Sequence, residues 1–113
     1  MQRARRLRKS SDFALARRLG KSRVDRRLVL IARANDSGAT RFGFSVSKRL
    51  GNAVTRNKIK RRLKSAAVRA SVQEGWDIVV IARQDARTAD YWALKRSLDR
   101  LLARSGVLEP KTG

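Results

Sequence analysis

The stretch from Arg41 to Gln73 carries ten basic side chains and no acidic one. An ordinary solvated surface mixes both signs, as residues 74–113 do with seven basic and six acidic side chains. Unpaired cations stay at the surface, so this stretch can bury only a narrow apolar stripe and presents a cationic face to solvent. The pattern indicates a surface that binds a polyanion.

The whole chain has 29 basic and nine acidic side chains in 113 residues, a formal charge of +20. Its hydrophobic share of 42% is too high for a disordered tail, and its length suits one domain. The longest apolar runs, Leu28–Ala32 and Ile78–Ala82, are far shorter than the ~20 residues of a membrane-spanning helix. We therefore expect a cytoplasmic protein with nucleic acid as its partner, although acidic lipid and simple solubility are alternative reasons for the charge.

Histidine and cysteine are both absent. Their absence excludes a disulfide framework and a thiol nucleophile, and removes the commonest general base and metal ligand. The nine acidic residues are scattered, and none lies between Ser37 and Gln73, where the basic residues gather. A nuclease that holds its metal ions on protein ligands is therefore disfavoured, and we predict no catalytic and no metal-binding residue.

Capping residues, apolar periodicity and turn residues predict the secondary structure. Ser10 or Ser11 is the expected N-cap of a first helix, which Gly20 ends. Asn52 is the expected N-cap of a second helix. The predicted elements are, in order, a helix to residue 19, strands at 28–32 and 42–47, a helix to residue 70, a strand at 77–82, and a helix that begins at Thr88 or Asp90 and ends before Ser105.

The apolar residues of these elements predict how they pack. In the second helix, Ile59, Leu63, Ala66 and Ala70 fall within about a 60° arc, and basic side chains occupy most of the remaining circumference. The last strand is apolar throughout, which is typical of burial on both faces. The element order predicts an α/β or α+β sandwich, with helices packed on one sheet. We expect a single domain at residues 10–106, between a mobile basic arm at 1–9 and a flexible tail at 107–113.

Three short motifs follow one another at the start of the second helix. They read SVSKR at Ser45–Arg49, GNAV at Gly51–Val54 and RNKIKR at Arg56–Arg61. They correspond to a strand end, a tight turn and the first turns of a basic helix, whose amides and arginines attract phosphate. This run resembles the protein subunit of bacterial ribonuclease P. Residues 5–20 and 77–83 resemble the start and the late buried strand of the same family.

The resemblance implies more about the fold than the residue pattern predicts. It implies a mixed four-stranded sheet with three helices, of the ribosomal protein S5 domain 2-like type. It also implies a left-handed β-α-β crossover, which general topology rules disfavour. The pattern of residues predicts neither this crossover nor a fourth strand.

The resemblance also implies a function and a set of sites. In that family a catalytic RNA subunit with bound Mg²⁺ removes the 5′ leader of precursor tRNA, and the protein holds both RNAs. The implied partners are one RNA subunit per protein and precursor tRNA, with no membrane, no obligate protein partner and no cofactor bound to the protein. The implied leader-binding residues are Phe13, Val29, Ile31, Ser45, Arg49, Arg56, Asn57 and Ala82. The implied contacts to the RNA subunit are Lys48, Lys58, Lys60, Arg61, Arg62 and Lys64.

Three departures from the family pattern should weaken base stacking, so that charge contributes more of the binding. Arg17 stands where the family often has a second aromatic residue, Ile31 where it often has tyrosine, and Lys58 where it has arginine. Phe13 has two interpretations, a stacking platform for a base or a staple between helix and sheet. A ribosomal protein that binds rRNA fits the composition equally well. A DNA-binding protein is less favoured, because a strand and not a second helix precedes the basic helix.

Overall fold

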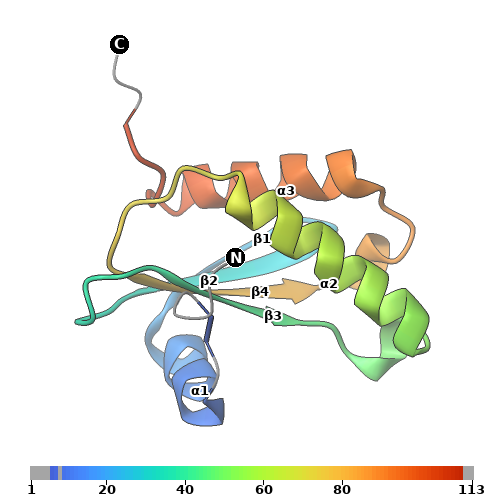
Figure 1. Ribbon diagram of the computed structural model, residues 1–113, viewed down its shortest axis with the longest axis horizontal. Helices are drawn as coiled ribbons and strands as arrows, with labels where there is room; N and C mark the ends of the chain where they lie inside the picture. Colours follow the sequence, from blue (N-terminus) through green and yellow to red (C-terminus); the bar gives the residue numbers. More distant parts are fainter. Residues whose placement is uncertain (1–5, 8, 111–113) are drawn as a thin grey trace.

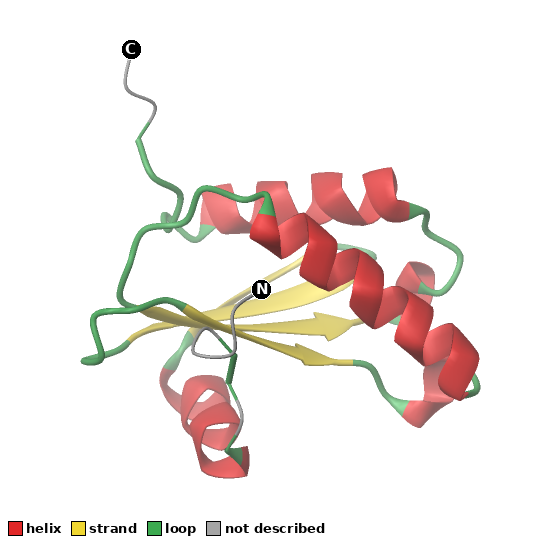
Figure 2. Ribbon diagram, viewed as in Figure 1, coloured by secondary structure: helices red, strands yellow, loops and turns green. Residues whose placement is uncertain are grey.

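A mixed four-stranded sheet lies between one helix on one face and two helices on the other (Figures 1 and 2). The computed structural model describes residues 6–7 and 9–110. Two short 3₁₀ helices follow β3 and β4. The elements are α1 (Ser10–Leu19), β1 (Lys21–Val24), β2 (Leu28–Ala34), β3 (Arg41–Ser45), η2 (Lys48–Leu50), α2 (Ala53–Val68), β4 (Trp76–Ala82), η3 (Gln84–Ala86) and α3 (Tyr91–Arg104).

The strand order across the sheet is β1-β2-β4-β3. Strand β2 pairs antiparallel with both β1 and β4, whereas β3 and β4 are parallel neighbours joined through α2. This β3-α2-β4 connection has the left-handed sense that the resemblance implies (Figure 1). The fourth strand, β1, is exposed at every position, so it carries no alternation that a sequence pattern could reveal.

Two hydrophobic clusters hold the layers together, one on each face of the sheet. In β4, Ile78, Val80 and Ala82 belong to the large cluster beneath α2 and α3. The alternate residues, Val79 and Ile81, belong to the smaller cluster beneath α1. The prediction that this strand is buried on both faces is therefore confirmed, since side chains alternate across a strand.

The two helices of the main layer begin where capping residues predict. The Asn52 Oδ1 accepts a hydrogen bond from the Thr55 amide at 3.0 Å, and the Asp90 Oδ1 accepts one from the Ala93 amide at 2.8 Å. In α2 the buried stripe contains Ile59 and its neighbours one turn on, as predicted. Both helices therefore bury one apolar side on the sheet and leave the opposite side to solvent.

Helix α1 begins and ends differently from the prediction. Its N-cap is Lys9, and no side chain caps it, so neither serine has the predicted role. Gly20 does end the helix, but with a φ of −78°, outside the left-handed region. A glycine is needed there for space, because a Cβ would lie 2.5 Å from the Ala16 carbonyl oxygen and 2.6 Å from Ile31 Cγ2.

The ordered domain extends past both predicted boundaries. The Leu7 amide donates to the Phe42 carbonyl at 2.9 Å, and the Leu7 side chain is buried. Val107 is also buried, and its carbonyl accepts from the Gln73 amide at 2.8 Å. Residues 1–5, 8 and 111–113 of the predicted arm and tail lie outside the described residues.

The first cation of the acid-free stretch, Arg41, has a structural partner. Its Nε and Nη2 donate to the two carboxylate oxygens of Asp77 at 2.9 and 2.8 Å, and Asp77 is fully buried. The hydrogen bond with Asp77 raises the pKa of Arg41 above its ordinary value. Arg41 also lies 3.5 Å from the Asp12 carboxylate on α1. This arginine therefore joins α1, β3 and β4 and is not available for a polyanion.

Candidate nucleic-acid interface

The turn between β3 and α2 fixes the position and direction in which the basic helix begins. Gly51 has a φ of 138°, and a Cβ on it would lie 3.0 Å from the Thr55 Cβ, so only glycine fits without strain. In η2, Leu50 is buried in the main core. Its neighbours Lys48 and Arg49 are exposed. One buried leucine thus anchors a segment whose two cations face solvent beside the α2 N-terminus, where helix amides attract anions.

Helix α2 divides its cations between two sides. Residues four apart share a side, so Arg56, Lys60 and Lys64 form one row along the helix. Arg62 lies toward the segment that precedes α3, where its Nη1 donates to the Ala89 carbonyl at 3.0 Å. Arg61 is exposed. The predicted contacts to the RNA subunit therefore do not form one face, and Arg62 has a structural hydrogen bond.

The row along α2 continues onto the N-terminal segment. Burial lowers the pKa of Lys64, and the nearby positive charges of Arg6 and Lys60 lower it further. The positive charges of Arg6 and Lys60 thus both lie near that of Lys64 and repel it. An anionic ligand placed among them would relieve this repulsion, so the cluster of Arg6, Lys60 and Lys64 is suited to phosphate.

Arg56 has an unused donor. Its side chain is half-buried, and its Nε is buried without a hydrogen-bond partner in the part of the chain that the structure describes. A buried donor without an acceptor costs free energy, which a phosphate or carbonyl oxygen of a ligand would recover. Asn57, the next residue, is exposed and offers both a donor and an acceptor.

A hollow of about 430 Å³ lies between α1 and the end of β3. Phe13 forms part of it and also packs on the sheet, because a Cβ at Gly43 would lie 2.5 Å from the ring. Phe13 is therefore a staple between helix and sheet, and its role as a stacking platform stays a prediction. Arg17, which replaces a family aromatic, lines the same hollow with its charged side chain. The lining residues are Ser10, Phe13, Ala14, Arg17, Phe44 and Ser45.

Two predicted leader contacts on the strands, Ile31 and Ala82, do not line this hollow. Ala82 lies on the opposite face of the sheet, in the cluster under α2 and α3, so it cannot line the hollow beside α1. Ile31 lies on the expected face but is 8% exposed, because α1 covers it. Val29 and Ile81 are the partly exposed apolar residues of that face. Ile81 was missed, and counting the two-residue alternation from Ile78 would have identified it.

The described residues contain no helix long and apolar enough to cross a membrane. Over the same residues, no group of three or more acidic side chains is placed to hold a metal ion.

A family model described as Ribonuclease P matches residues 1–106. The chain belongs to the ribonuclease P protein family. It is 36% identical over 104 residues to the ribonuclease P protein component of Clostridioides difficile, with 89% of this chain and 91% of that protein covered. It is also 36% identical over 110 residues to the protein component of Streptococcus equi subsp. equi, with 96% and 92% covered.

Solved structures of the family agree with the fold. The RNase P protein of Staphylococcus aureus superposes with a TM-score of 0.84 at 35% identity, covering 95% of this chain and 100% of that one. The RNase P protein of Thermotoga maritima superposes with a TM-score of 0.80 at 34% identity, covering 88% of this chain and 96% of that one. Membership gives the chain a role in tRNA processing as a ribonuclease P component that works with an RNA subunit.

Proposed function

We propose that this protein binds the catalytic RNA of ribonuclease P in a one-to-one complex and holds the 5′ leader of precursor tRNA. The RNA subunit carries the cleavage chemistry, with Mg²⁺ bound mainly by that RNA and the substrate. The protein contributes binding and orientation, and it works in the cytoplasm, where precursor tRNA is processed.

The observation that carries this proposal is the continuity between the hollow and the basic helix. Ser45 lines the hollow at the end of β3, and the chain passes directly to Arg49 and then to Asn57. A single-stranded leader that lies in the hollow with a base near Phe13 would therefore meet cations at its phosphates. The unpartnered Nε of Arg56 adds a donor beside this path.

The placement of the acidic residues is consistent with the proposed division of labour. Cleavage of a phosphodiester by protein-bound metal ions needs clustered carboxylates. Here Asp77 is buried against Arg41, and Asp12 lies 3.5 Å from the same arginine. Asp90 caps α3. Each of these three carboxylates thus has a structural partner within the protein.

A cleavage assay tests the proposal. Protein with Mg²⁺ and precursor tRNA should give no product, and addition of the RNA subunit should give a single cut at the 5′ end of the mature tRNA. Site-specific cleavage by the RNA-free protein would contradict the division of labour. Sequencing of the RNA that copurifies with the tagged protein tests the partner: ribosomal RNA in place of one structured catalytic RNA would favour the ribosomal alternative.

A further inference from the structure

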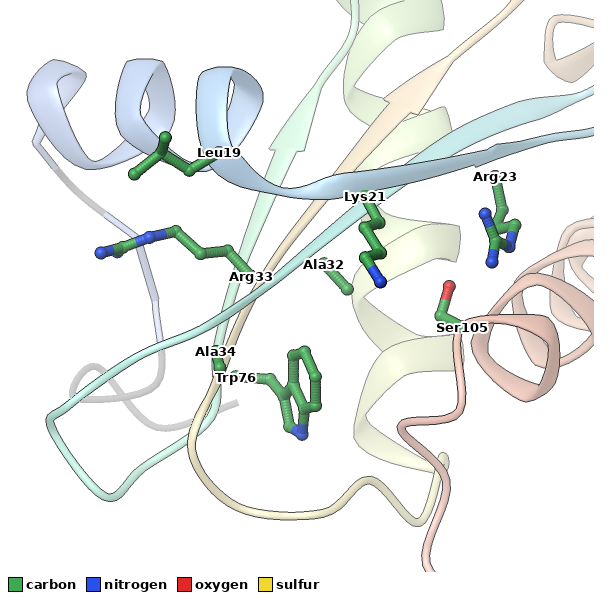
Figure 3. Close-up of a pocket in the computed structure, with 8 residues that line it drawn as sticks. All are labelled: Leu19, Lys21, Arg23, Ala32, Arg33, Ala34, Trp76 and Ser105. Carbon is green, nitrogen blue, oxygen red and sulfur yellow. The ribbon is translucent and has the colours of Figure 1, made fainter.

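A second hollow lies beside β1, where its lining runs from Leu19 at the end of α1 to Ser105 just past the end of α3 (Figure 3). Its volume is about 430 Å³. It exists because Ala32 and Ala34 place small side chains in the row of β2 that faces α3, and because α3 ends at Arg104 and leaves this corner uncovered. Ser105, just past the helix end, forms one wall.

The walls of this hollow combine an aromatic ring with cations. Lys21 and Arg23 extend from the same side of β1, and the indole of Trp76 lies across from them (Figure 3). Trp76 is half-buried against the main core, so its ring is held in place. Arg33 also lines the hollow, but its side chain points away from the indole.

The two cations of β1 keep their charge available to a ligand. Neither Lys21 nor Arg23 forms an ion pair with a carboxylate within the described residues. The Arg23 Nε donates to the Arg104 carbonyl at 3.5 Å, which holds the guanidinium beside the hollow without neutralising it. An anion in the hollow would therefore interact with two positive charges that no carboxylate of the described residues neutralises.

We propose that this hollow binds one unpaired nucleotide of an RNA, with the base against Trp76 and the phosphate on Lys21 and Arg23. Base stacking on an aromatic side chain and phosphate binding by flanking cations are the usual means by which proteins hold single-stranded RNA. The cations disfavour a neutral apolar occupant, and the volume is within the range of small-ligand sites, about 300–1,000 Å³.

This site is separate from the proposed leader path. Ala32 and Trp76 belong to the cluster beneath α2 and α3, whereas Phe13 and Gly43 meet on the face beneath α1. The hollow is at the start of β4, and the leader path is at the end of β3, which runs parallel to β4. The inference rests on the proposed function, since that function supplies the RNA. The nucleotide could come from the RNA subunit or from precursor tRNA.

The intrinsic fluorescence of Trp76 can report binding of RNA in the hollow. The chain has two tryptophans, and Trp92 is 65% exposed on α3, so Trp92→Phe leaves Trp76 as the one reporter without disturbing the core. The RNA subunit is titrated into this variant, and precursor tRNA is then titrated into the preassembled holoenzyme. A saturable change in Trp76 fluorescence is expected in one of the two titrations, and that titration identifies the source of the nucleotide.

The double variant Lys21→Gln with Arg23→Gln tests the phosphate contacts. Both residues are exposed on an edge strand, so the fold should be kept. The change should abolish the fluorescence response and reduce the slope of log K against log salt by about 0.7–0.9, because the two cations hold one phosphate. The matched control is Arg87→Gln with Arg96→Gln, which removes the same charge from exposed positions outside the hollow.

Three results would overturn the inference. One is an unchanged Trp76 fluorescence in both titrations while the holoenzyme still assembles and cleaves, which would leave the proposed function intact. Another is an equal loss of affinity in both double variants, which would mean that only net charge matters. Absence of any binding to the RNA subunit would overturn this inference and the proposed function together.

Discussion

Gly43 allows the Phe13 ring to lie directly on β3, since a Cβ at that position would come within 2.5 Å of the ring. Gly43→Ala should therefore displace Phe13 and cost about 1–3 kcal/mol of unfolding free energy, as overpacking does. Urea denaturation measures this cost. The control is Gly38→Ala in an open turn, where a Cβ meets no atom within 4 Å but the φ of 78° strains alanine. A Gly43→Ala protein as stable as the wild type would mean that the ring is not fixed.

Asp25 gives the protein a pH-dependent contribution to stability. Burial raises the pKa of its carboxyl group, but hydrogen bonds from the Leu28 and Arg27 amides outweigh burial, so the net pKa is below the ordinary 3.8. Asp25 therefore stabilises the fold above about that value, and the contribution is lost as the pH falls through the lower, folded-state pKa.

The variant Asp25→Asn removes this titration. It should be less stable than the wild type at neutral pH, and the difference in unfolding free energy should shrink as the pH falls below 3.8. Denaturant titrations at several pH values measure the difference. A difference that stays constant down to the lowest pH would show that the carboxylate charge has no part in it.

At the scale of elements, the two sides of α2 should respond differently to mutation. Lys60→Ala with Arg61→Ala should weaken binding of the RNA subunit and lower the slope of log K against log salt by about 0.7–0.9 for each lost phosphate contact. Arg62→Ala should instead lower stability by about 0.5–1.5 kcal/mol, because it breaks the hydrogen bond to Ala89. Salt-dependent binding and thermal denaturation separate the two. An unchanged salt slope in the double variant would mean that Lys60 and Arg61 face only solvent.

The helices were easier to predict from the sequence than the first strand of the sheet. The cap of α2 at Asn52 was predicted, and the cap of α3 at Asp90 was one of two predicted, with Thr88, because the capping side chain and the apolar stripe are both local signals. The motif around Arg56 and Asn57 was enough to indicate the family. Strand β1 was not predictable from the pattern, because its pairing partner supplies its stability and its own side chains are all exposed.

Other misses have a common physical cause, which is that they depend on contacts between distant segments. The role of Gly20 in making room for Ile31 is decided by how α1 packs on β2. Ala82 was taken from the family motif, and only the packing of the sheet shows that its side chain lies in the cluster beneath α2 and α3. The burial of Val107 depends on the hydrogen bond from Gln73, which no local pattern shows.

At the scale of the whole molecule, the excess positive charge and much of the main hydrophobic core come from different parts of the sequence. Residues 74–113 supply β4 and α3, which contribute much of the main core and carry a nearly balanced charge. The excess positive charge lies in the first two thirds of the sequence, which form α1, the hollow beside it, and α2. The electrostatic attraction for RNA therefore comes mainly from the elements that surround the proposed leader path.

The central claim is that this path holds the leader of precursor tRNA. Its most direct test is the affinity of the assembled holoenzyme for precursor and for mature tRNA, measured for the wild type, Phe13→Ala and Asn57→Ala. Asn57 is exposed, so its variant should keep its stability and serves as the control for Phe13→Ala, which also removes packing. We expect both variants to lose affinity for precursor tRNA, by about 1–3 kcal/mol where a stacked base is lost, and to bind mature tRNA as before. Equal losses for precursor and mature tRNA in both variants would contradict the claim.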